Sequence, residues 1–193
     1  MMGVDVIDIR KFASINSSKE YFLDTNVLYW YCYPRITGYQ MPLRGQPYYD
    51  FVDGLVSAGN PIITSIYNVS ELLNVVEKNE FEIFKKQHTE AVYSIKDFRR
   101  NANERIRVQN NLKTTLSNVR NTCRILVFDF KDEHMTSFVD TLPNHRCDLF
   151  DYIILQNCIS LNKVNIITDD NDFSTIDGIK LYTANDVTIN AAV

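Results

Sequence analysis

The chain has 193 residues, of which 45% are hydrophobic and 23% charged, and its net charge is −4. This length and apolar content are sufficient for one substantial core, so we expect a single domain over residues 1–193. A negative net charge argues against a protein that coats nucleic acid non-specifically. No apolar stretch approaches the ~20 residues needed to cross a bilayer, and the acidic N-terminal region lacks the pattern of a signal peptide. We therefore expect no membrane association and a cytoplasmic location.

Apolar periodicity and turn-forming residues predict an alternation of strands and helices after a polar lead that ends at Lys19. Strands are expected at 20–24, 61–64, 124–130, 164–168 and 178–182. Helices are expected at 27–33, 48–58, 66–76, 131–139 and 148–161, with two or three more between 77 and 121. Thr25 or Asn26 can cap the first of these helices. Strands separated by helices predict an α/β fold with three layers, in which helices cover both faces of a central parallel sheet.

A helical, basic segment is expected at about residues 80–122. From Lys85 to Arg124 there are ten Lys and Arg residues against three acids, although the whole chain is acidic. Such a segment is typical either of a surface that contacts the phosphates of a nucleic acid or simply of the solvated faces of helices. The candidate nucleic-acid-binding residues are Arg99, Arg100, Arg105 and Arg107.

Several other kinds of catalytic or binding site have no sequence signature here. The four cysteines form no Cys-x-x-Cys pair and lie in apolar or helical contexts, which favours reduced structural thiols over disulfides or a zinc site. No Gly-x-Ser-x-Gly motif and no glycine-rich phosphate loop is present.

Carboxylates recur where expected strands end or expected helices begin. Asp24 directly follows the first strand, Asp170 lies in the acidic run 168–173 after a later strand, and Asp151 follows the start of a helix. Because the carboxyl ends of parallel strands meet at one edge of a sheet, we expect these acids to converge with Glu71. Converging carboxylates repel each other unless a cation holds them, and oxygen ligands suit Mg²⁺ or Mn²⁺.

Each acid also has a purely structural interpretation. Asp24 can cap a helix, and Glu71 can lie on the polar face of its helix. Asp148 and Asp151 are three residues apart at a helix start, so they share a face and favour the positive end of the helix dipole. We expect Asp148 to be the cap and Asp151 to face the metal. Thr25 can orient Asp24 or a bound water.

In order along the chain, four motifs are similar to those of a known family. They are Leu23-Asp24-Thr25-Asn26, Ser70-Glu71-Leu72, Asp151-Tyr152-Ile153-Ile154 and Thr168-Asp169-Asp170-Asn171-Asp172-Phe173. Together they resemble the PIN-domain family of metal-dependent ribonucleases, which includes the VapC-type toxins. The resemblance implies a PIN-like fold with an acidic quartet of Asp24, Glu71, Asp151 and Asp170. Asp172 would be a further metal ligand, with Thr25 and Asp148 as accessory residues.

The resemblance implies an endoribonuclease that hydrolyses RNA phosphodiester bonds with a water activated by Mg²⁺ or Mn²⁺. It also raises the role of a toxin that pairs with an antitoxin protein. The aromatic residues from Tyr29 to Tyr49 can form either a homodimer face or part of the core. Two alternatives stay open: a catalytically inactive PIN-like module that binds RNA or protein, and a phosphatase-like α/β enzyme. This chain is longer than the small toxins, and the excess lies in the loop at 38–47 and the helical stretch at 80–121.

Overall fold

Six parallel strands form one sheet in the order β1-β6-β5-β2-β3-β4 in the computed structural model, which describes residues 4–11, 19–36, 41–89 and 93–192. The strands are β1 (Asp5–Asp8), β2 (Tyr21–Leu23), β3 (Ile62–Ser65), β4 (Arg124–Leu126), β5 (Asn165–Ile167) and β6 (Lys180–Thr183). The predicted parallel sheet is confirmed. Strand β1 was not predicted, because it lies at an edge of the sheet and none of its residues is fully buried. Strand β4 ends at Leu126 rather than continuing to Phe130.

Strand β2 at the centre of the sheet shows why the sheet is covered on both faces. Its three residues are almost completely buried, and successive side chains of a strand point to opposite faces. Tyr21 and Leu23 pack into one hydrophobic cluster, whereas Phe22 packs into a second cluster that also contains Tyr152 and Leu155. Two cores separated by one sheet define the three-layer arrangement that the sequence predicted.

The helices differ from the prediction mainly in length. They are α1 (Thr25–Cys32), α2 (Gln46–Ser57), α3 (Ile66–Gln87), α4 (Ile95–Arg100), α5 (Ala102–Thr122), α6 (Asp132–Thr141), α7 (Leu149–Ser160) and α8 (Asp186–Ala191). Short 3-10 turns lie at Ile9–Lys11, Leu142–Asn144 and Asp172–Thr175. Helix α3 continues eleven residues beyond Val76, where the apolar periodicity weakens, and the short α8 was not predicted.

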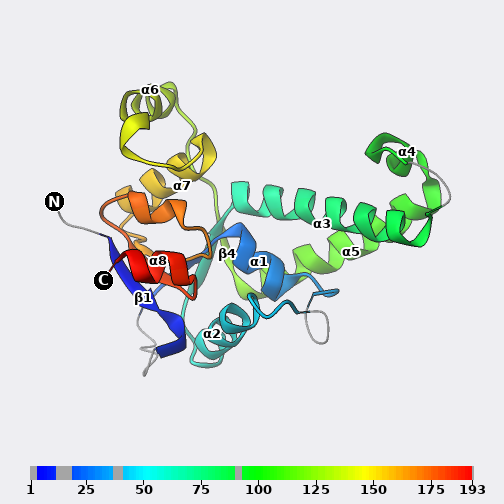
Figure 1. Cartoon of the computed structure of the whole chain (residues 1–193), viewed down its shortest axis with the longest axis horizontal. Helices are drawn as coiled ribbons and strands as arrows, with labels where there is room; N and C mark the ends of the chain where they lie inside the picture. The colour runs from blue at the N-terminus through cyan, green and yellow to red at the C-terminus, as the bar shows by residue number, and fades with distance from the viewer. Residues whose placement is uncertain (1–3, 12–18, 37–40, 90–92, 193) are drawn as a thin grey trace.

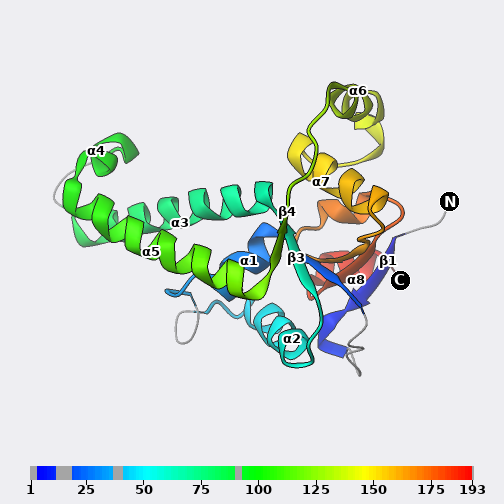
Figure 2. The same cartoon turned by 180° about the vertical axis from the view of Figure 1, so that it is seen from behind.

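Helices α3 and α5 lie side by side and extend away from the sheet as an arm with α4 at its far end (Figures 1 and 2). A small separate cluster of Phe84, Phe98 and Val108 holds the three helices together there. Near the sheet, both long helices contact α1. The arm therefore contains the basic segment expected from the sequence, whereas the sheet and its flanking helices form the body.

The arrangement of the strands creates a crevice beside β2. The chain passes from β2 to β3 on one side, whereas β5 pairs with β2 on the other side. Ligands of open α/β sheets bind outside the carboxyl ends of strands at such a switch point. Asp24 follows β2 here, helix α3 follows β3, and residues 168–170 follow β5.

Two further predictions concern membranes and cysteines. Within the described ranges, no helix combines the length and the apolar character required to span a bilayer. All four cysteines are buried and free. Burial raises the pKa of the Cys147 thiol to about 12, so a reduced and unreactive thiol is expected, as the sequence predicted.

Candidate active site at the carboxyl edge of the sheet

Four carboxylates from four different elements line one pocket of about 370 Å³. Asp24 comes from the end of β2, Glu71 from α3, Asp151 from the first turn of α7 and Asp170 from the loop after β5. The structure thus brings together residues that are up to 146 positions apart in the sequence. These are the four acids that the motifs single out.

Asp24 is the most tightly held of the four. It is the N-cap residue of α1, one of the three candidates at positions 24–26, and its carboxylate accepts the Thr25 backbone N–H at 2.6 Å. Side-chain amides of Asn26 and Asn68 donate to it at 2.7 and 3.0 Å, and the Thr168 hydroxyl donates at 2.6 Å. Only 5% of Asp24 is exposed. One buried carboxylate therefore accepts donors from three separate elements, which fixes its orientation.

The side-chain hydroxyl of Thr25 orients Glu71 rather than Asp24. Its hydroxyl donates to a carboxylate oxygen of Glu71 at 2.7 Å and accepts the Asn68 amide at 3.1 Å. The polar chain from Asn68 through Thr25 links the first turns of α1 and α3. It directs Glu71 toward the pocket even though that residue lies on the exposed side of its helix.

The electrostatics of the pocket disfavour charge on two of the acids. Burial, opposed by hydrogen bonds from Thr168 and Thr25 and reinforced by the nearby charges, raises the pKa of Asp24 to about 7. Burial and the neighbouring carboxylates of Asp24, Asp148 and Asp170 raise the pKa of Asp151 to about 8. Among the described residues, no Lys, Arg or His side chain forms an ion pair with any of the four pocket acids. A bound cation would remove this repulsion.

The other acids near the pocket have different roles. Asp148 is the N-cap of α7 and accepts the Asp151 backbone N–H at 2.9 Å, as predicted. Asp172 is not among the residues that line the pocket; its side chain lies 3.3 Å from the Arg146 guanidinium. Its backbone N–H donates to the Asp170 carboxylate at 2.8 Å, so Asp172 positions Asp170 through the main chain.

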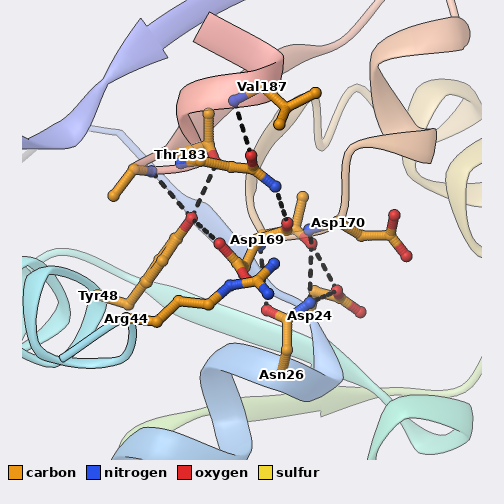
Figure 3. Close-up of polar contacts among 11 residues, drawn as sticks. Asp24, Asn26, Arg44, Tyr48, Asp169, Asp170, Thr183 and Val187 are labelled. Carbon is orange, nitrogen blue, oxygen red and sulfur yellow. Dashed lines mark hydrogen bonds and ion pairs between the residues drawn. The ribbon is translucent and has the colours of Figure 1, made fainter. Parts of the chain in front are cut away.

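Asp169 is an acid that the sequence did not distinguish from its neighbours. Figure 3 shows its side chain directed toward Tyr48 and Arg44, whereas the Asp170 side chain extends the opposite way. The Tyr48 hydroxyl donates to Asp169 at 2.8 Å, Arg44 forms an ion pair with it, and the Asn26 side chain accepts its backbone N–H. Asp169 thus anchors the loop that presents Asp170, and it connects that loop to α2.

Two residues that support the site were missed in the sequence. Asn68 is 1% exposed, and a polar residue on the otherwise apolar face of the helix 66–76 was the available signal. Thr168 ends a buried run just before the acids, and its hydroxyl accepts the Asp170 N–H at 2.9 Å while donating to Asp24. A buried polar group requires a partner. The sequence could therefore have predicted that Asn68 and Thr168 form hydrogen bonds with the acidic segments that follow β2 and β5.

The candidate nucleic-acid-binding arginines lie on α4 and α5, toward the far end of the arm from the pocket (Figure 1). Arg99 and Arg105 form ion pairs with Glu77, and Arg107 pairs with Glu80. Arg100 is the most exposed of the four, with 81% of its side chain accessible. The structure therefore does not bring these four residues to the acidic pocket.

The donor set of the pocket fits a hard divalent cation. Within the described part of the chain, no three His, Cys, Asp or Glu side chains are arranged so that they could hold a metal ion together. Mg²⁺, however, keeps several water ligands and is commonly held by only one or two carboxylates together with substrate phosphates. The pocket offers carboxylate groups with raised pKa values, and these groups would release their protons to the solvent when a cation binds.

Comparison with known proteins identifies relatives of this fold. The family model described as "PIN domain" matches residues 21–179. No curated protein matches the sequence. A chain in the crystal structure of VapBC2 from Rickettsia felis bound to a DNA fragment from their promoter has a similar structure, with a TM-score of 0.50 and 20% sequence identity. The match covers 85% of this chain and 98% of that chain, which shows a shared fold.

Proposed function

Because this chain belongs to the PIN domain family, we propose that it is a metal-dependent endoribonuclease. The observation that carries the proposal is the convergence of Asp24, Glu71, Asp151 and Asp170 on one pocket without a basic partner among the described residues. Charge repulsion of this kind destabilises a fold unless it serves a bound cation. The substrate is RNA, and the cofactor is Mg²⁺ or Mn²⁺.

The four pocket acids are held in different ways, and their proposed roles differ accordingly. A divalent cation bound at the pocket would supply an activated water and neutralise negative charge on the phosphate. Asp24 is fixed by its donors from three elements, and Asp170 is held by the Asp172 N–H. Glu71 is aimed by Thr25. Asp151, with its pKa of about 8, can hold a proton at neutral pH in the absence of a cation.

Neither alternative function accounts for the geometry as well. A phosphatase that forms a phosphoaspartate would use a single nucleophilic carboxylate, and it gives no role to the convergence of Glu71, Asp151 and Asp170 with Asp24. The segment Asp24-Thr25-Asn26 also lacks a second acid two residues later. An inactive binding module would not need four converging acids, since their repulsion brings no benefit without a cation.

The experiment that tests the proposal is cleavage of a labelled single-stranded RNA panel in Mn²⁺, Mg²⁺ and EDTA. Asp24→Asn is compared with the wild type, and Asp140→Asn, which changes an exposed acid on α6, is the matched control. We expect cleavage that requires metal, is reduced at least about 10³-fold in Asp24→Asn, and is unchanged in the control. Equal cleavage in EDTA or by Asp24→Asn would refute the proposal.

We further propose that the protein is the toxin of a toxin–antitoxin pair. The support is its likeness in fold to a chain of the VapBC2 complex, together with the nuclease function proposed above. Expression of the wild type should then arrest growth of a bacterial host, and the Asp24→Asn variant should not. Normal growth of cells that accumulate active wild-type nuclease would contradict the toxin role and leave the nuclease proposal intact.

A further inference from the structure

A second cavity adjoins the acidic pocket. It has a volume of about 340 Å³ and shares Glu71 and Asp151 with the first pocket. Its remaining lining residues are Tyr67, Ser70, Asn74, Asp148, Phe150 and Ile154. Four of the lining residues, at positions 67, 70, 71 and 74, follow the spacing of a single helical face, so one face of α3 forms a wall of this cavity. The start of α7 forms the opposite wall.

Two aromatic residues line this cavity, Tyr67 and Phe150, and the ring of Phe130 lies beside that of Phe150. We refer to these three residues as the aromatic cluster, which is partly open to solvent. Phe150 is 53% exposed and Phe130 is 43% exposed. The ring of Phe150 lies 6.0 Å from that of Tyr67 and 6.1 Å from that of Phe130, and both pairs are tilted. The Tyr67 hydroxyl donates to the Phe128 carbonyl at 3.2 Å, which fixes its ring. The cluster is thus partly pre-organised, and the described residues leave part of its apolar surface exposed.

The chemistry of the cavity matches a nucleobase. A base offers a flat π-face for stacking on aromatic rings and a polar edge for hydrogen bonds, and Ser70 and Asn74 provide a hydroxyl and an amide on the same wall. The volume is at the lower end of the range for ligand pockets, which suits one nucleoside. Phe150 directly precedes Asp151, so a base stacked there would belong to a nucleotide beside the phosphate at the acidic pocket.

A protein partner fits this cavity less well. The cores of protein interfaces are depleted of charged residues, whereas three carboxylates line this cavity, namely Glu71, Asp148 and Asp151. A nucleotide bound with a cation would place its ribose and phosphate beside those acids and its base over the rings. The mixed aromatic and acidic lining therefore favours a nucleotide.

We propose that the aromatic cluster is a base-binding subsite that stacks the nucleobase next to the scissile phosphate. The inference rests on the proposed nuclease function and adds to it a subsite that recognises one base of the substrate. Bases in a duplex are already stacked on both faces, so the subsite selects single-stranded RNA or an unpaired loop. Phe150 contributes the most exposed ring and is a substrate-positioning residue.

The test compares the wild type with Phe150→Ala, Phe150→Trp and a matched control, Leu161→Ala. Leu161 is 51% exposed and lies at the other end of α7, so the control removes a similar apolar surface away from the cavity. The substrate is a short single-stranded RNA with 2-aminopurine beside the cleaved bond. The readouts are KM and kcat in Mn²⁺, and the quenching of 2-aminopurine on binding in Ca²⁺. Thermal melts verify that each variant is folded.

We expect Phe150→Ala to raise KM about 10-fold and to abolish most of the quenching, with a smaller change in kcat. Phe150→Trp should retain both properties, because tryptophan also stacks, and Leu161→Ala should resemble the wild type. A folded Phe150→Ala variant with unchanged KM and quenching would overturn the subsite and leave the nuclease proposal intact. A wild-type protein that does not cleave RNA in any metal would overturn the nuclease proposal and the subsite together.

Discussion

The arm and the acidic pocket both hold carboxylates away from water, but they treat the charge in opposite ways. In the arm, the fully buried Glu80 forms ion pairs with Arg35 and Arg107 and accepts the Asn111 amide at 2.8 Å. Hydrogen bonds and ion pairs with Arg99 and Arg105 hold the pKa of Glu77 below its usual value. Both acids that are buried in the described part of the arm, Glu77 and Glu80, thus have basic partners.

The acids of the pocket, in contrast, are not compensated by basic side chains of the described residues. Burial and neighbouring carboxylates raise the pKa values of Asp24 and Asp151, and among the described residues no basic side chain forms an ion pair with them. The comparison shows that burial alone does not mark a functional acid. What distinguishes the pocket acids is the lack of a basic partner among the described residues, which is why we propose that a bound cation balances their charge.

The largest effect on stability is expected when an acid that has basic partners is removed. Glu80→Ala should reduce the free energy of unfolding by about 3–5 kcal/mol, because it leaves Arg35 and Arg107 without their shared carboxylate. Urea denaturation measures this change. A loss below about 1 kcal/mol would show that the arm does not depend on its ion pairs.

Neutralising an uncompensated acid should act in the opposite direction. The pKa of Asp151 is raised from 3.8 to about 8, so the folded protein holds a proton over a pH range in which the unfolded chain has released it. The contribution of the Asp151 carboxyl group to the free energy of unfolding is therefore fully present below about pH 3.8, and it is lost as the pH rises through about 8. Asp151→Asn should be more stable than the wild type at pH 8 by about 2 kcal/mol, since neighbouring acids absorb part of the effect.

The pH dependence provides the control for that prediction. The advantage of Asp151→Asn should shrink as the pH falls toward 4, where the wild-type carboxyl group is protonated in the folded state. Metal-free denaturation curves at pH 8 and pH 5 measure it. Equal stability of the two proteins at pH 8 would indicate that Asp151 is not electrostatically strained.

A smaller effect on stability is expected at Asp169, an acid beside the pocket that has a basic partner. Asp169 lies next to the pocket residue Asp170 but pairs with Arg44, as an acid of the arm would. Arg44→Gln should therefore destabilise the protein by about 1 kcal/mol, because the exposed partner of a buried carboxylate is lost while its Tyr48 hydrogen bond remains. Chemical denaturation measures this loss, and a gain in stability would place Asp169 among the uncompensated acids.

The smallest effect on stability is expected at Arg100. Its guanidinium is highly exposed and lies 3.8 Å from Asp97, so Arg100→Ala should change stability by less than about 0.5 kcal/mol. Its expected role is contact with RNA phosphates, and the variant should reduce the salt dependence of RNA binding by about one charge. Filter binding at several salt concentrations measures the slope. An unchanged slope would remove Arg100 from the RNA-binding surface.

Much of the body could be predicted from the sequence because its signals are local. Apolar runs define β2, β3 and β5, and the acids that follow two of them lie at a sheet edge by the geometry of parallel strands. Strand β1 could not be found in this way, because an edge strand need not bury its side chains. The continuation of α3 beyond Val76 depends on packing against α5, which local periodicity does not report.

The site was harder to predict in its supporting contacts than in its acids. The roles of Asn68 and Thr168 depend on hydrogen bonds to Asp24, which lies 44 and 144 residues away in the sequence. The difference between Asp169 and Asp170 depends on where Tyr48 and Arg44 lie in the fold. Likewise, a basic segment in the sequence did not show that three of its arginines pair with Glu77 and Glu80.

The most direct test of the account is a calorimetric titration of Mn²⁺ into the purified protein. The wild type and Glu77→Gln, in which an acid of the arm is neutralised, should both bind the ion at pH 7 and release protons to the buffer. Asp24→Asn, in which an acid of the pocket is neutralised, should lose the binding. Failure of the folded wild type to bind Mn²⁺, or undiminished binding by Asp24→Asn, would contradict the claim that the uncompensated acids form a metal site.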